Sequence, residues 1–321
     1  MDRWDRVGHY AAYGAALALT PYLVIKVVWV TGSLIGVAPI GSGFNRAGWI
    51  ALNTVTIGMA GIGIALALAL VRPWGMRIPG WLVAFCAWTG AGFLVSILPY
   101  AVLTTALDSG GGSPKAGDGD GPSMPGWEAA LVQFSFIGMG LGLALALPAY
   151  LRRWPAVFAA RAGDFHRSTV PWAPALAAVV GLAWLYWALG GSLGLAHPAE
   201  RDTDGYLLNA VGAFWALAGS AAAWLSVRGR TVRLSRRWLS AVGWLGSGSL
   251  FAWSAWKLPF TLYVGLTEPT DVTLPENYAV AAVLHVAAVA AGVGLLRSLL
   301  DPTSPRARAT ESGKTPVRSE G

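Results

Sequence analysis

Three ionisable side chains lie inside long apolar stretches of the sequence, where a charged group is costly and usually has a function. Lys26 is flanked by Val-Ile and Val-Val, Lys257 lies in WSAWKLPF, and His285 lies in AVLHVAA. Two ammonium groups at a similar depth could attract an anionic ligand or a lipid headgroup, and an imidazole could tune or neutralise their charge. Trp29 and Trp187 complete this candidate ligand-binding set.

Each of these residues also has a purely structural interpretation. A lysine near a helix end can extend its ammonium group to the membrane surface, as Lys26 and Lys257 could do. His285 could serve as a hydrogen-bonded contact between helices, and Trp29 and Trp187 could anchor helix ends at the membrane surface. Both interpretations are open at the level of sequence.

The sequence contains few of the residue patterns that catalysis requires. The sequence contains no HExxH, CxxC or GxSxG motif, and the carboxylate nearest to the middle of an expected helix is Glu128, at an outer end. Cys86 is the single cysteine and lies in an apolar run, so we expect it to be a small buried apolar side chain rather than a nucleophile. We therefore expect no catalytic residue, no metal site and no cofactor, and the sequence favours a protein that is not an enzyme.

The elements that carry these residues follow from the composition. Of 321 residues, 55% are hydrophobic and 12% are charged, whereas a soluble domain has about a quarter charged residues. A helix needs about 20 apolar residues to cross a bilayer, and eight continuous apolar segments are long enough: 12–36, 48–71, 79–103, 127–150, 171–195, 205–227, 237–264 and 277–300. The sequence predicts an all-α integral membrane protein with eight transmembrane helices.

The basic residues predict the orientation of these helices. Eighteen of the 23 Lys and Arg residues lie in the N-terminus, in the even-numbered connections and in the C-terminal segment, while the other side has only Arg46, Lys115 and Arg201. Because cytoplasmic loops carry the excess of basic residues, both termini should be cytoplasmic in a multi-pass protein of the plasma membrane. The first apolar segment is too long for a signal peptide and lacks a cleavage site, so we expect it to be retained.

Short phrases recur along the chain in the same order at offsets of 156 to 160 residues. The pairs are VVWVTGSLIGV from Val27 and WLYWALGGSLGL from Trp184, GWIALN from Gly48 and GYLLN from Gly205, Trp81-Leu82 and Trp238-Leu239, and LPYAVL from Leu98 and LPFTLY from Leu258. This spacing predicts two tandem four-helix repeats, residues 1–150 and 151–300, with a flexible outer loop at 108–126 and a disordered cytoplasmic tail at 301–321.

Each repeat has an even number of spans, so both repeats should have the same orientation in the membrane. Such a pair is related by a pseudo-two-fold axis along the membrane normal, and a cavity, where one exists, tends to lie between the halves. On the ligand-binding interpretation, Trp29 and Trp187 would face each other across that axis.

The second repeat resembles a known family. The residues Tyr186 to Gly191, followed by Gly194-Leu195, are similar to the Y-W-A-L-G-G motif of a bacterial four-helix membrane domain of unknown function that is common in actinobacteria. The first repeat departs from this motif, with Thr31 and Gly32 in place of the double glycine. The resemblance implies a four-helix unit and implies no activity or cofactor.

Three functions are compatible with these features. The leading one is a structural or accessory membrane protein that binds lipids or a partner membrane protein through its helices or through the arginine-rich run RGRTVRLSRR at residues 228–237. The alternative is binding or transport of a small anionic or lipid ligand in an outward-facing pocket between the halves. A second alternative is an enzyme acting on a lipid-linked substrate. The net charge of +7 is not arranged as a stripe for nucleic acid, so no nucleic-acid partner is expected.

Overall fold

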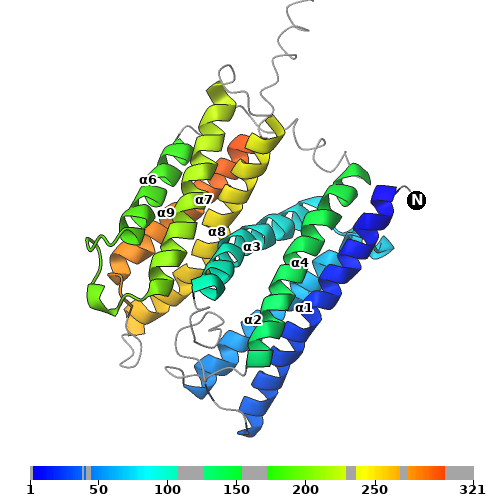
Figure 1. Cartoon of the computed structure of the whole chain (residues 1–321), viewed down its shortest axis with the longest axis horizontal. Helices are drawn as coiled ribbons and strands as arrows, with labels where there is room; N and C mark the ends of the chain where they lie inside the picture. The colour runs from blue at the N-terminus through cyan, green and yellow to red at the C-terminus, as the bar shows by residue number, and fades with distance from the viewer. Residues whose placement is uncertain are drawn as a thin grey trace, which may run out of the picture.

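A computed structural model describes residues 3–37, 40, 45–107, 126–153, 172–228, 236–267 and 274–300. These residues form eight α-helices, labelled as in Figure 1: α1 (Arg3–Ile35), α2 (Arg46–Ala69), α3 (Gly80–Leu107), α4 (Gly126–Arg153), α6 (Trp172–Ala188), α7 (Thr203–Arg228), α8 (Arg236–Thr267) and α9 (Tyr278–Leu300). Two short 3-10 helices, η1 (Pro73–Arg77) and η3 (Pro198–Glu200), lie in connections. The expected tail, most of the expected loop at 108–126 and most of the run at 228–237 lie outside the described residues.

Each of the eight helices overlaps one of the eight segments expected from the sequence, so the all-helical prediction is confirmed. The largest differences are at two ends, since α1 begins at Arg3 rather than at residue 12 and α6 ends at Ala188 rather than at residue 195. The early end of α6 has a local cause: Gly190 and Gly194 have φ angles of 95° and 82°. This left-handed conformation suits glycine and stops the helical hydrogen-bond pattern.

Length and hydropathy single out five described helices as able to cross a membrane, namely α1, α2, α3, α7 and α9. The apolar parts of α4 and α6 are shorter, at Ala130–Ala146 and Trp172–Ala188. The helix α8 has the length but includes Lys257, several serines and several tryptophans, and these residues lower its hydropathy. Composition by itself therefore supports a protein with several membrane-type helices.

The helices form two groups with α3 between them (Figure 1). In one group, α6 packs on α7 and α9, and α8 packs on the same two helices, which makes a four-helix bundle. In the other group, α1 packs between α2 and α4. The helix α3 packs mainly on α8 and less extensively on α7, α2 and α4. The division between residues 150 and 151 stays a prediction, because α3 connects the two groups.

Small side chains fill the contacts between helices, and large apolar ones cover the outer surface. The buried cluster of the four-helix bundle combines Trp184, Trp187 and Leu250 with many alanines, as in membrane bundles whose backbones approach closely. On the outer surface, large apolar residues of several helices are exposed, among them Leu17, Phe134, Val179, Phe214 and Val283. An apolar surface on this scale indicates contact with lipid or with another protein.

Candidate functional site

Lys26 on α1 is paired with an asparagine on α2. Its Nζ atom donates a hydrogen bond of 2.9 Å to Oδ1 of Asn53, and the Asn53 side chain is only 1% exposed. The amide nitrogen of Asn53 in turn donates to the carbonyl of Trp49, one helical turn away, at 2.8 Å. The Lys26 ammonium is thus held by a buried acceptor on the neighbouring helix.

Aromatic rings complete the surroundings of Lys26. Its Nζ atom lies 4.3 Å from the centroid of a Trp29 ring and 5.5 Å from that of Tyr22, both within the range of cation–π attraction. Trp29 stacks on Trp49 at 5.7 Å and donates its indole N–H to Oε1 of Glu128 on α4 at 3.2 Å.

We call the five residues Lys26, Trp29, Trp49, Asn53 and Glu128 the Lys26 group. Its members come from three helices, since α1 contributes the lysine and one tryptophan, α2 contributes the asparagine and the other tryptophan, and α4 contributes the carboxylate. The group therefore brings a cation, an anion and an amide together where α1, α2 and α4 meet.

A second polar contact joins α8 and α9. Nδ1 of His285 lies 3.2 Å from Oγ of Ser254, and which atom donates depends on the histidine tautomer. Lys257, one turn further along α8, has its Nζ atom 5.6 Å from the centroid of Trp253. A serine and a histidine at this distance could form an activated nucleophile. However, Ser254 is 0% exposed, so a substrate cannot reach its hydroxyl group.

Trp187 lies at the end of α6, inside the four-helix bundle. Its ring is buried, and its indole N–H donates to the carbonyl of Leu193 at 2.8 Å. The backbone N–H of Leu193 donates to the hydroxyl of Tyr186 at 3.3 Å, and the N–H of Gly191 donates to the Tyr186 carbonyl. The Y-W-A-L-G-G residues therefore close the helix with a turn held by their own side chains.

The five predicted site residues are divided between the two helix groups. Lys26 and Trp29 have the neighbours described above on α2 and α4, whereas Trp187, Lys257 and His285 have theirs within α6 to α9. A ligand-binding role for these residues stays a prediction.

Sequence reasoning missed the partners of these residues. Asn53 is the last residue of the repeated phrase GWIALN, and an asparagine in an apolar segment is itself a signal of a polar contact between helices. Asn209, the last residue of the similar phrase GYLLN, makes the same local bond, from its amide nitrogen to the carbonyl of Gly205. Ser254 carried no signal of its own because serine is common throughout these helices.

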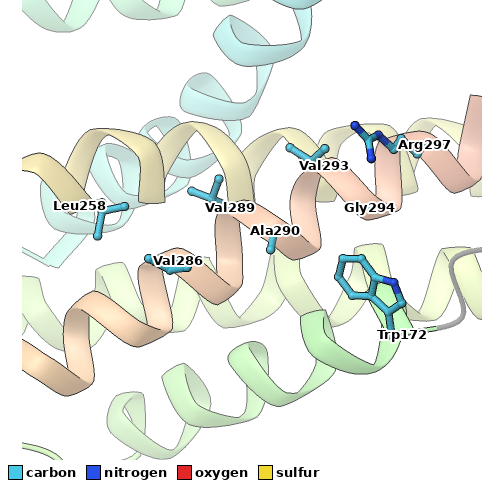
Figure 2. Close-up of a pocket in the computed structure, with 8 residues that line it drawn as sticks. All are labelled: Trp172, Leu258, Val286, Val289, Ala290, Val293, Gly294 and Arg297. Carbon is cyan, nitrogen blue, oxygen red and sulfur yellow. The ribbon is translucent and has the colours of Figure 1, made fainter.

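Two surface cavities lie on the four-helix bundle. The first has a volume of about 540 Å³ and is shown in Figure 2; it is lined by Trp172, Leu258, Val286, Val289, Ala290, Val293, Gly294 and Arg297. The second has a volume of about 520 Å³ and is lined by Ala183, Tyr186, Trp187, Leu193, Ala279, Val280, Val283 and Leu284. Of the predicted site residues, Trp187 alone contributes to these two linings.

Within the described ranges, no cluster of three or more His, Cys, Asp or Glu side chains is placed to hold a metal ion. Comparison of the chain with protein-family models, with curated proteins and with solved structures finds no match.

Proposed function

We propose that this chain is a multi-pass membrane protein with a structural or accessory role, in which ionisable side chains inside the membrane join helices together. The observation that carries this proposal is the 2.9 Å hydrogen bond from Lys26 to the buried Asn53. A lysine that binds a ligand must present its ammonium to that ligand, whereas this one has a protein acceptor and aromatic neighbours.

Hydrogen bonds between connections support a membrane crossing by α8. The backbone N–H groups of Ala196 and His197, after α6, donate to the carbonyl of Pro275, before α9, and the N–H of Asn277 donates to the carbonyl of Gly194. Two connections bonded in this way lie at the same membrane surface. Because α7 is long and apolar enough to cross, α8 must cross as well to bring the chain back.

Contacts in the first helix group support membrane crossings by α2 and α3. Arg46, at the start of α2, donates from Nε to the carbonyl of Ser33 near the end of α1 at 2.7 Å. Glu128, at the start of α4, accepts from Trp29 near the end of α1. These three helix ends therefore belong to one surface, and the distribution of basic residues makes it the outer one. These contacts support the proposal of eight crossings with both termini in the cytoplasm.

The contact between α3 and α8 supports the two tandem repeats, because these helices are the third of each repeat. Near a two-fold axis a helix contacts its own counterpart. Oγ of Ser96 lies 2.8 Å from Oγ of Ser249, and Trp88 donates its indole N–H to Oγ of Ser247 at 3.0 Å. We propose that the pseudo-axis passes between α3 and α8, and that the resemblance to the bacterial four-helix domain applies to the second repeat.

The alternative function, ligand binding at Lys26 and Lys257, is tested by native mass spectrometry of the intact protein in mild detergent. Wild type is compared with Lys26→Met and Lys257→Met, which keep the side-chain length and remove the charge. We expect the same set of adducts in all three proteins. A discrete adduct that is present in wild type and absent from both variants would overturn the structural role and identify a ligand by its mass.

A further inference from the structure

The first cavity is an apolar groove with a cation at one end (Figure 2). Valine, alanine and leucine side chains of α8 and α9 form its length, and the exposed guanidinium group of Arg297 lies at its end. The residues that line it include no carboxylate that could pair with this guanidinium. The groove thus combines an apolar channel with one accessible positive charge.

The length of the groove fits one leaflet of a bilayer. Its lining residues on α9 run from Val286 to Arg297 with the spacing of one helix face. At 1.5 Å per residue this distance is roughly 17 Å. A hydrocarbon core is about 30 Å thick, so one leaflet takes up about 15 Å. An acyl chain that lies in the groove would extend from the membrane surface to the middle of the bilayer.

The end of the groove near Arg297 also carries an interfacial tryptophan. A Cβ atom at Gly294 would come within 2.6 Å of the Ala173 Cβ atom, so glycine is needed for the first turn of α6 to pack on α9. This close approach brings the ring of Trp172 beside the groove, near Arg297 (Figure 2). Tryptophan rings and basic side chains are the usual neighbours of lipid headgroups.

We propose that this groove binds one acyl chain of an anionic phospholipid in the cytoplasmic leaflet, with the lipid phosphate at Arg297. The proposal rests on the membrane orientation given under the proposed function, which puts the end of α9 at the cytoplasmic surface. A guanidinium group binds phosphate with two parallel hydrogen bonds. An anionic headgroup keeps its net negative charge beside Arg297, whereas a choline headgroup brings a cation of its own.

The test compares lipids that differ only in the headgroup. The full chain is stripped of lipid in mild detergent, and phosphatidylglycerol or phosphatidylcholine with identical acyl chains is added during native mass spectrometry. We expect wild type to retain one phosphatidylglycerol in preference to phosphatidylcholine. Arg297→Gln should lower this retention roughly tenfold, because it removes one charge-assisted contact. Arg77→Gln, an exposed arginine on η1 at the same predicted surface, should leave it unchanged.

A second pair of variants tests the apolar part of the groove. Ala290→Phe fills the groove and should lower the retention of both lipids, whereas Ala183→Phe makes the same change in the second cavity and should not. Size-exclusion profiles show that each variant is folded. Equal retention of the two lipids by wild type, or equal losses in Arg297→Gln and Arg77→Gln, would overturn the lipid site.

The lipid site and the structural role fail in different ways. A protein that fractionates with membranes but shows no preference for phosphatidylglycerol disproves the lipid site only. An adduct that depends on Lys26 and Lys257 rather than on Arg297 disproves the structural role. Recovery of the chain outside the membrane fraction would disprove both.

Discussion

At the scale of single residues, Lys26 shows how a charge is accommodated in an apolar helix. The ammonium group has the Asn53 oxygen at 2.9 Å and the face of Trp29 at 4.3 Å. Asn53 is buried and its own N–H group is used within α2. Removal of Lys26 takes the donor from the buried Asn53 oxygen, and removal of Asn53 takes away one acceptor of the ammonium group, so the two residues should depend on each other energetically.

A double-mutant cycle tests this dependence. Lys26→Met, Asn53→Leu and the double variant are compared by the free energy of unfolding in detergent micelles. We expect a coupling energy of about 1 kcal/mol, within the range measured for polar contacts between membrane helices. The control pairs Asn53→Leu with Lys257→Met, whose side chain lies near Trp253 instead. The effects of these two control substitutions on the free energy of unfolding should add. A coupling energy near zero between Lys26 and Asn53 would contradict the contact between their side chains.

At the scale of elements, the crossing of α3 and α8 depends on glycine. A Cβ atom at Gly92 would overlap the backbone carbonyl of Gly248. A Cβ atom at Gly90, two residues earlier on α3, would meet nothing within 4 Å. These glycines therefore lie on different faces of α3, one against α8 and one in open space.

The two glycines provide a matched pair of variants. Gly92→Leu should push α3 away from α8 and lower the free energy of unfolding by about 1–3 kcal/mol, the usual cost of overpacking. Gly90→Leu should change it by less than about 0.5 kcal/mol, as for a surface substitution. Thermal unfolding in detergent measures both. Equal destabilisation by the two variants would show that α3 does not pack on α8 through this face.

At the scale of the whole molecule, the bonded connections after α6 and before α9 constrain the path of the chain. They bring Gly194 to His197 next to Pro275 to Asn277. In the proposed membrane arrangement, the segment from α7 to α8 therefore crosses the membrane an even number of times. A protein in which only the five most apolar helices cross would separate these two connections.

Cysteine labelling in intact cells tests this path. In a Cys86→Ala background, single cysteines replace Ala196, Glu276 or Arg77. A membrane-impermeant maleimide should label the cysteines at 196 and 276 directly, because the proposed orientation puts both connections outside, and the cysteine at 77 only after permeabilisation. Labelling at 196 without labelling at 276 before permeabilisation would show that α7 crosses and α8 does not.

The sequence by itself determined the helices, because a long apolar run is a local property. All eight expected segments are helical, and only the glycine-rich turn after Ala188 shortened one of them substantially. The positions of Lys26, Lys257 and His285 within apolar helices were also predictable. So was the contrast between connections with many and with few basic residues, on which the predicted orientation rests.

Only the tertiary structure decided which residues meet. Asn53 is 27 positions from Lys26 and Glu128 is 99 positions from Trp29, and no local pattern joins either pair. Nor did the sequence indicate that α3 packs on α8 rather than within its own repeat. The physical reason is that these helices are apolar on all sides, so hydrophobic periodicity does not mark a packing face. The contacts are chosen instead by close fit at small residues such as Gly92 and by the pairing of a few polar groups across helices.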